Sequence, residues 1–574
     1  MTATVQKNEI LSFKHPGFGK GKSNKSAKGR SLDPVAMQQV QTLTKGMATT
    51  SDMIIEYLHV IQDNFGHISA AHIRAIAETL NLSQAEINET ATFYAHFDII
   101  REGEETPPEL TIRVCESISC QIMGAESLKL AISNGVDESK VRVLNAPCMG
   151  RCHQAPVAEV GHNHIGKATA DNVLKAVSND DTHHTVPKYQ SYEDYMAEGG
   201  FTRLKSILAG EHKHDDIVEF VKNSGLRGLG GAGFPVGLKW SFVRAAEGPR
   251  VMAVNGDEGE PGTLKDHHYL STRPFQFLEG MLIGAWVIEA TDVYIYLRDE
   301  YPDVRELLLK EIKRVEDEGY ASHTKIHLRR GAGAYICGEE SAMLESIEGK
   351  RGWPRQRPPF VAQVGLWGKP TLVNNVESLY WIPEILNKEE GWFKSHGANG
   401  REGLRSFSIS GRVKNPGVHF APAGVTIQEL IDDYADGMED GHTFKAYLPG
   451  GASGGILPAS MNDIPMDFDT LNQYGCFIGS ASVVVLSDAD NMADIALNLM
   501  AFFEDESCGQ CTPCRVGTEK IMKLISGDDW DIELLKEIST VMMDASICGL
   551  GQAAPNPLLR VIEHFPNEIP ALKK

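Results

Sequence analysis

The most constraining feature of the chain is a run of three cysteines near its C-terminal end. Cys508, Cys511 and Cys514 are each separated by two residues, and no further cysteine follows until Cys548. Three thiolates at this spacing can hold three corners of a compact cluster, and the distant cysteine can supply the fourth. Structural zinc sites favour two separated pairs, so zinc fits the triplet poorly. The spacing therefore predicts a [4Fe–4S] cluster.

A second set of four cysteines lies in the first third of the chain. Cys115 and Cys120 form a C-x4-C pair, and Cys148 and Cys152 form a C-x3-C pair. Two such pairs, each following a predicted strand, suit a [2Fe–2S] unit with one pair on each iron. Zinc also favours two pairs, so the residues alone leave both metals open. The two remaining cysteines stand alone in AYICG and YGCFIG, where a cysteine acts as a small hydrophobic side chain.

Charge and length exclude several classes of protein. The 574 residues exceed the size of one hydrophobic core, so several domains are expected. A net charge of −22 argues against a nucleic-acid partner. No apolar run is long enough for a membrane span, and the start of the chain has no secretion signal, so we expect a cytoplasmic protein with reduced cysteines. Residues 1–47 are basic and poor in apolar residues, which predicts either a solvated tail or an arm that orders on an acidic partner.

Hydrophobic patterning outlines the order of the elements. Apolar residues recur at helical spacing from residue 52, and Ser83 with Glu86 forms a capping-box signature. Short strands are expected at 110–114 and 141–144 with a helix between them, and a linker is expected at about 181–199. Strands and helices mix from about 200 to 405. A smaller strand-rich unit follows, and a helical section ends the chain.

The stretch GLRGLGGAGFP supplies Gly228, Gly230, Gly231 and Gly233. A dinucleotide-binding turn requires a strand immediately before such glycines, but the preceding DDIVEFVKNSG has a helical pattern. The usual form of that fold is therefore not expected. The glycines still permit close backbone approach to a flat or phosphorylated ligand, and Lys239 follows as a positive charge.

Two further stretches set carboxylates among glycines. VNGDEGEPGTLKD contains Asp257, Glu258 and Glu260, and GAGAYICGEE contains Glu339 and Glu340. This pattern suggests hydrogen bonding to a polar cofactor. Because a hydride carrier delivers two electrons together and an iron–sulfur cluster accepts one at a time, a flavin between them is expected.

Five longer motifs carry a family resemblance. GGAGFPVGLKW, NGDEGEPGTLKD, GAGAYICGEESAMLESIEGKRG, PTLVNNVE and SCGQCTPCRVG resemble the NADH-binding flavin subunit of respiratory complex I over about residues 200–574. Residues 52–175 are similar to the small thioredoxin-like [2Fe–2S] subunit, which favours [2Fe–2S] over zinc. Such fusions occur in diaphorase subunits of NAD-reducing hydrogenases and of molybdenum- or tungsten-dependent formate dehydrogenases. LPGGASGGILPASMNDIPMDFDTL and YGCFIGSASVVVLSD look like the formate dehydrogenase beta subunit.

The resemblance implies a multidomain α/β protein. The expected units are a basic flexible tail (1–47), a helical bundle (48–105), a thioredoxin-like [2Fe–2S] domain (106–180), a linker (181–199), a Rossmann-like α/β FMN/NADH domain (200–405), a β-grasp domain (406–490) and a helical [4Fe–4S] domain (491–574).

It also implies the residues around the cofactors. Glu340 would position NAD, and no side chain would carry a proton in the reaction. FMN would be held by Gly228, Gly230, Gly231, Lys239, Asn255, Asp257, Glu258, Tyr335, Gly338, Glu339, Glu340, Asn374 and Asn375, and NAD by Phe234, Phe242, Glu340, Arg357 and Phe360. Relatives often have Arg where this chain has Leu229, and Lys where it has Arg357.

By this likeness, the chain would be the output subunit of an NAD-dependent formate dehydrogenase. A large molybdopterin alpha subunit, with molybdenum or tungsten and further Fe–S clusters, would oxidise formate. Electrons would pass through the clusters and FMN to NAD⁺ as hydride. A diaphorase of an NAD-reducing hydrogenase or a module of a quinone-reducing complex stays open as an alternative.

Overall fold

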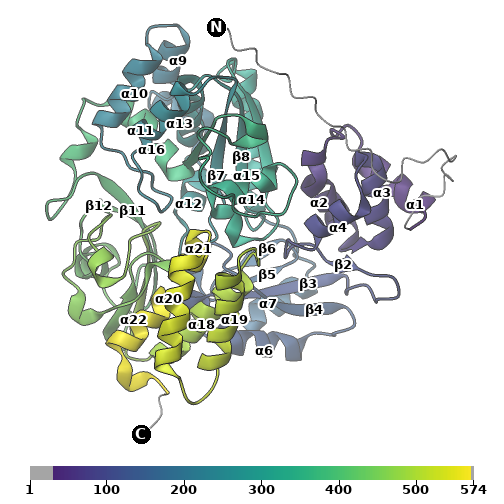
Figure 1. The fold of residues 1–574 in the computed structure, drawn as a ribbon, viewed down its shortest axis with the longest axis vertical. Coiled ribbons are helices and arrows are strands. Elements are labelled where there is room, and N and C mark those ends of the chain that lie inside the picture. The colour runs from purple at the N-terminus through teal and green to yellow at the C-terminus, as the bar shows by residue number, and fades with distance from the viewer. Residues whose placement is uncertain (1–29, 571–574) are drawn as a thin grey trace, which may run out of the picture.

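Residues 30–570 fold into five modules that pack against one another (Figure 1). The structure is a computed structural model that describes residues 30–570. Most of the predicted basic tail, residues 1–29, lies outside the described residues. Within the described part, no helix combines the length and apolar character needed to cross a membrane.

The first module is a helical bundle. Its second helix buries the apolar residues that predict it, and the capping box of Ser83 and Glu86 is confirmed at the start of the fourth. The bundle consists of α1 (Pro34–Leu43), α2 (Ile54–Phe65), α3 (Ala70–Leu80) and α4 (Gln84–Ala91), with a two-residue pair of strands β1 (Ile68–Ser69) and β2 (Ile99–Ile100).

The second module is the predicted thioredoxin-like unit. Its four-stranded sheet has the order β4-β3-β5-β6, in which β3 runs parallel to β4 and antiparallel to β5. Its elements are β3 (Leu110–Cys115), α5 (Ile118–Ile122), α6 (Ala125–Gly135), β4 (Val141–Ala146), β5 (Ala158–Val160), β6 (Asn163–Ile165) and α7 (Ala170–Ser178).

The third and largest module contains a parallel sheet in the order β10-β7-β8-β9. Alternate residues of β7 enter two hydrophobic cores: Met252 packs on the α13 side and Val251 on the α15 side. The module contains α8 (Tyr192–Ala197), α9 (Thr202–Leu208), α10 (His214–Asn223), α11 (Val236–Ala245), β7 (Arg250–Gly256), α12 (Lys265–Thr272), α13 (Pro274–Val287), β8 (Ala290–Leu297), α14 (Pro302–Asp317), β9 (Lys325–Arg330), α15 (Glu340–Ile347), β10 (Thr371–Asn375) and α16 (Val376–Asn387).

The last two modules complete the fold. A five-stranded mixed sheet in the order β12-β11-β15-β13-β14 forms the predicted β-grasp unit, and helices α18 to α22 pack beside it (Figure 1). The elements are β11 (Leu404–Gly411), β12 (Gly417–Pro422), α17 (Ile427–Glu429), β13 (Phe444–Leu448), β14 (Leu457–Pro458), β15 (Ser482–Ser487), α18 (Met492–Asp505), α19 (Thr512–Ile525), α20 (Ile532–Ala545), α21 (Gly549–Ala553) and α22 (Asn556–His564).

Two expected segment boundaries are wrong. Helix α1 falls inside the range assigned to the flexible tail. Asp33 caps its N-terminus, Pro34 occupies its first turn, and Ala36 and Val40 bury an apolar stripe against the bundle. Helix α8 likewise falls inside the expected linker, where Ser191 caps it through the backbone of Asp194. Both helices are short and lie beside polar segments, so their few apolar residues did not predict a helix.

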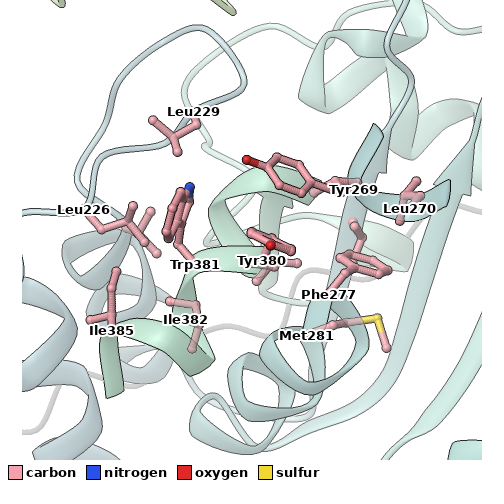
Figure 2. Close-up of a cluster of buried hydrophobic side chains, with 14 of the residues drawn as sticks. Leu226, Leu229, Tyr269, Leu270, Phe277, Met281, Tyr380, Trp381, Ile382 and Ile385 are labelled. Carbon is pink, nitrogen blue, oxygen red and sulfur yellow. The ribbon is translucent and has the colours of Figure 1, made fainter. Parts of the chain in front are cut away.

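A hydrophobic cluster anchors the glycine-rich stretch to the third module (Figure 2). Leu226 and Leu229 point from this stretch toward Trp381 on α16, and Ile385 lies beside them. Leu229 is only 4% exposed, and its backbone N–H donates to Ser378 Oγ at 2.9 Å. Leu229 therefore serves as an apolar anchor of the glycine-rich stretch.

Candidate functional site

A cavity of about 580 Å³ lies where three modules meet. The third module contributes the glycine-rich loop and the residues that follow β7, the β-grasp unit contributes two loops, and Leu550 of α21 closes one side. Small-molecule and cofactor sites fall in this range of size. The volume and the mixed polar and apolar walls suit a cofactor with a flat ring and a polar tail.

The glycine-rich loop forms one wall. A Cβ at Gly230 would lie 2.9 Å from the Cβ of Asn375, and Gly231 has a φ of +137°, so both positions require glycine. Within residues 30–570, the backbone N–H groups of Gly230, Gly231 and Ala232 donate to no acceptor of the chain. Such free amides side by side are suited to bind an anionic group.

The residues after β7 form a second wall. Asn255 donates to the carbonyl of Gly338 at 2.8 Å and accepts from the backbone of Asp257 at 3.0 Å, which fixes the loop. Oδ2 of Asp257 is buried and has no partner among the described residues, and burial raises the pKa of this carboxyl well above its usual value. The carboxyl group of Asp257 therefore offers a buried oxygen without a protein partner to a ligand in the cavity. These observations fit a flavin nucleotide.

Glu258 lies on the wall, but the protein already uses its carboxylate. Its oxygens accept from the backbone N–H groups of Asp266 and His267 at 2.8 and 3.0 Å and from the Tyr301 hydroxyl at 2.8 Å. Burial raises its pKa to about 7. Glu258 therefore holds the start of α12 in place.

The predicted FMN residues divide into two groups. Asn374 is 3% exposed and accepts from Trp240 Nε1 at 2.9 Å, so it supports the wall from behind. Nine of the predicted residues line the cavity, namely Gly230, Gly231, Asn255, Asp257, Glu258, Tyr335, Gly338, Glu339 and Asn375, whereas Gly228, Lys239, Glu340 and Asn374 do not.

A charged group borders the cavity at the start of α15. Glu339 caps this helix by accepting from the backbone N–H groups of Ser341 and Ala342, both at 2.9 Å. Arg357 pairs with Glu339 and lies 3.2 Å from Glu340. Lys239 Nζ is 3.8 Å from the other oxygen of Glu340. Two cations thus hold the Glu340 carboxylate in a fixed position.

The three phenylalanines predicted to contact NAD lie off the cavity wall and are exposed. Phe234, Phe242 and Phe360 are 40%, 52% and 54% exposed, and the ring centroids of the first two are 6.2 Å apart. Exposed aromatic faces of this kind are available to stack on a planar ligand.

Sequence reasoning singled out the carboxylate of Glu260 but missed its partner Ser453, and it also missed Lys265. Glu260 accepts from the backbone and hydroxyl of Ser453 at 2.8 and 2.7 Å and from the Tyr335 hydroxyl, which joins the β-grasp loop to the cavity. Lys265 is buried between Asp266 and Glu377 at 2.8 and 3.2 Å. Lys265 and Ser453 both lie inside motifs that carry the family resemblance. Those motifs marked the two segments as part of the site but did not reveal what either side chain contacts.

The first cysteine set forms what we call the enclosed centre: Cys115, Cys120, Cys148 and Cys152. All four side chains are buried, and the sulfur atoms of Cys148 and Cys152 are 3.3 Å apart. The Cys152 thiol lowers the pKa of Cys148 to about 6, with a further contribution from Arg298. The thiol of Cys115 raises the pKa of Cys120, and the other two thiols act on it as well. Four converging thiols fit a metal cluster.

The second set forms what we call the open centre: Cys508, Cys511, Cys514 and Cys548. Cys511 is the N-cap of α19 and Cys548 is the N-cap of α21, whose following residues line the cavity. Burial raises the pKa of Cys514 to about 12, with contributions from the three other thiols. The charge of Glu339 acts on Cys508 and Cys548, so this centre adjoins the cavity.

Family comparisons agree with this arrangement. The thioredoxin-like [2Fe-2S] ferredoxin family matches residues 40–180, the Nuo51 FMN-binding domain matches 221–384, and the NADH-ubiquinone oxidoreductase-F iron-sulfur binding region matches 494–572. The F 2 subunit of NADH-quinone oxidoreductase from Rhizobium meliloti (strain 1021) is 41% identical over 401 residues, which cover 67% of this chain and 95% of that protein. The chain belongs to the family of NADH-quinone oxidoreductase F subunits.

Hydrogenase subunits are also similar to this member of the family. NADP-reducing hydrogenase subunit HndC of Solidesulfovibrio fructosivorans is 38% identical over 67% of this chain and 80% of its own length. A crystal structure of NAD⁺-reducing [NiFe]-hydrogenase in the H2-reduced state matches 92% of this chain and 95% of its own, with a TM-score of 0.80 and 29% identity.

The family settles the cofactors that the residues left open. The chain binds FMN, a [2Fe–2S] cluster, a [4Fe–4S] cluster and NADH. The two-pair cysteine set is thus an iron–sulfur rather than a zinc site. The chain is an electron-transfer subunit of an NAD(P)H-dependent oxidoreductase.

Proposed function

We propose that this chain is the cytoplasmic diaphorase subunit of an NAD-dependent formate dehydrogenase. Its partner would be a large molybdopterin subunit, carrying molybdenum or tungsten and further Fe–S clusters, that oxidises formate. The observation that carries the proposal is the loop at 448–471, which looks like the formate dehydrogenase beta subunit and supplies Ser453 to Glu260 at the cavity.

Residues that line the cavity would bind FMN, and residues at its border would bind the nicotinamide nucleotide. FMN, when bound, exchanges hydride with NAD(H) and single electrons with iron–sulfur clusters. The free amides at Gly230 and Gly231 would bind its phosphate, and Asp257 and Asn375 would hold its polar groups. Arg357, Lys239 and Glu340 would orient the nicotinamide nucleotide, with Phe234, Phe242 and Phe360 as stacking surfaces. Positioning and exclusion of water are thus the contributions of the protein.

A second candidate is the diaphorase subunit of an NAD-reducing hydrogenase. The observation that favours it is the match to the hydrogenase chain over 92% of this chain, a share that exceeds the two thirds covered by the relatives of NADH-quinone oxidoreductase. In that case the partner would carry nickel and iron rather than a molybdopterin.

Isolation of the chain with its native partner tests both candidates. The expected result is a complex that contains molybdenum or tungsten and reduces NAD⁺ when formate is added. The same preparation, assayed with hydrogen and with a quinone, serves as the control. Nickel in the complex, with hydrogen-dependent and formate-independent reduction of NAD⁺, would replace the first proposal by the second.

A further inference from the structure

Three side chains that no cofactor assignment uses converge where the helical bundle meets the third module. His59 and Asp63 lie one turn apart on α2, and His96 follows α4. One ligand atom from each of the three lies within 4.8 Å of the others. Within residues 30–570, no other group of three histidine, cysteine or carboxylate side chains meets that spacing.

The hydrogen bonds of the two imidazoles fix which nitrogen of each ring is free. Nε2 of His59 lies 2.8 Å from the carbonyl of Gly331, and a carbonyl can only accept, so this nitrogen carries the proton. Nδ1 of His96 lies 2.6 Å from the carboxylate of Asp299, which fixes the proton there. Each ring therefore has its lone pair on its second nitrogen.

Both lone pairs are buried without a partner. Nδ1 of His59 and Nε2 of His96 are inaccessible to solvent and accept no hydrogen bond from the described residues, and His59 is only 2% exposed. A buried acceptor without a partner is unfavourable, because it has lost its hydrogen bond to water and gained none in return. Histidines that bind metal ions commonly donate their other N–H to a backbone carbonyl or a carboxylate, which is the arrangement of both rings.

The surroundings provide an entrance and a suitable charge. Asp63 and His96 line a cavity of about 480 Å³ that is open to solvent, so an ion can reach the group. Arg330 pairs with Asp63 at 2.6 Å and with Asp299 at 2.5 Å. One guanidinium faces two carboxylates, which leaves a net negative charge for a cation. Asp63 shares its oxygens with Arg330 and is the exposed, adjustable member of the group.

We propose that His59, Asp63 and His96 bind a divalent transition-metal ion of the zinc class at this joint. Two imidazoles and one carboxylate are a common ligand set for zinc, with a water in the fourth position. Tetrahedral binding at about 2.1 Å from each ligand separates the ligand atoms by about 3.4 Å, so the group draws together on binding. Because Gly331 and Asp299 belong to the third module, the ion would fasten the bundle to it.

The test is zinc content measured by elemental analysis. The purified complex with its flavin and clusters would be incubated with zinc chloride, passed through a desalting column and assayed for zinc, iron and sulfide. We expect one equivalent of zinc per chain in the wild type, and loss of most of it in both His59→Gln and His96→Gln. His327→Gln is the matched control, because His327 pairs with Asp292 at 2.9 Å outside the group.

Unchanged iron, sulfide and flavin in the variants would show that they fold and that zinc has not entered the cysteine centres. A thermal scan provides the second measurement: zinc should raise the melting midpoint of the wild type and leave both variants unchanged. A wild type that retains no zinc, or variants that retain as much as the wild type, would overturn the proposal and assign the two ring nitrogens to a bridging water.

Discussion

The two cysteine centres differ in how far the protein encloses them. At the enclosed centre the four cysteines are 1–4% exposed, whereas at the open centre Cys514 is buried and the other three are half-buried. The enclosed centre also receives Arg298, which donates to the carbonyl of Cys148 at 2.5 Å and to that of Glu258 on the cavity wall. Its ligands are therefore part of a joint between two modules.

The open centre has a different setting. Cys511 and Cys548 occupy the N-cap positions of α19 and α21. Glu339, which belongs to the charged group at the cavity border, acts electrostatically on Cys508. The enclosed centre is thus built into the packing of the modules, while the open centre lies beside the charged border of the cavity. Substitutions at the enclosed centre should reduce stability, and those at the open centre should affect electron transfer.

The largest expected effect is the loss of coupled turnover at the open centre. Cys548→Ala removes one ligand of the [4Fe–4S] cluster, and we expect no reduction of NAD⁺ by the substrate of the partner subunit. FMN content and the electron paramagnetic resonance signal of the [2Fe–2S] cluster should be unchanged. Cys120→Ala, the matched change at the enclosed centre, should instead lower the melting midpoint. Equal losses of stability in the two variants would refute the distinction.

Arg298→Met should have the next largest effect. Arg298 is 4% exposed and pairs with Glu300 at 3.0 Å, so its removal leaves a carboxylate and two carbonyls without their donor. Breaking a buried pair in this way costs about 3–5 kcal/mol. Chemical denaturation followed by flavin fluorescence and iron release measures the change. Arg515→Met, at an exposed arginine of the open centre, is the control and should shift the midpoint little.

The sequence predicted the modules because their signals are local. The strand at 110–114 is part of β3, the strand at 141–144 is part of β4, and the helix before the glycine-rich stretch is α10. Period and capping residues suffice for such elements. Leu229 could be read only as a departure from relatives, since its role depends on Trp381, which lies far along the chain.

The contacts that join the modules could not be predicted. Ser453 meets Glu260 across 193 residues, and Arg298 meets Cys148 across 150. No spacing rule relates residues so far apart. The same reason hid His96, whose partner Asp299 belongs to another module. The roles of Asn374 and Glu258 as internal supports likewise depend on their contacts with Trp240 and Tyr301. Trp240 lies in the motif GGAGFPVGLKW, but the motif does not indicate its hydrogen bond to Asn374.

A smaller effect is expected at the cavity border. Glu340→Gln removes the charge held between Lys239 and Arg357, and a hydrogen bond to a charged group contributes about 1.5 kcal/mol, or roughly tenfold in kcat/KM. NADH oxidation with an artificial acceptor measures it. Glu345→Gln is the control on the same helix, because its carboxylate pairs with Arg355 at 2.5 Å. Unchanged kinetics in Glu340→Gln would remove this residue from the site.

The smallest expected effect is that of Phe360→Ala. Its ring is 54% exposed, so the substitution should change the free energy of unfolding by no more than about 0.5 kcal/mol. Stacking of an aromatic ring contributes about 0.5–1.5 kcal/mol, so KM for NADH should rise roughly two- to twelvefold while kcat is retained. Leu309→Ala, at a side chain of similar exposure on α14, should leave both constants unchanged. A loss of stability in Phe360→Ala would mean that the border of the cavity is packed like the enclosed centre, and the contrast between the two sides would then be lost.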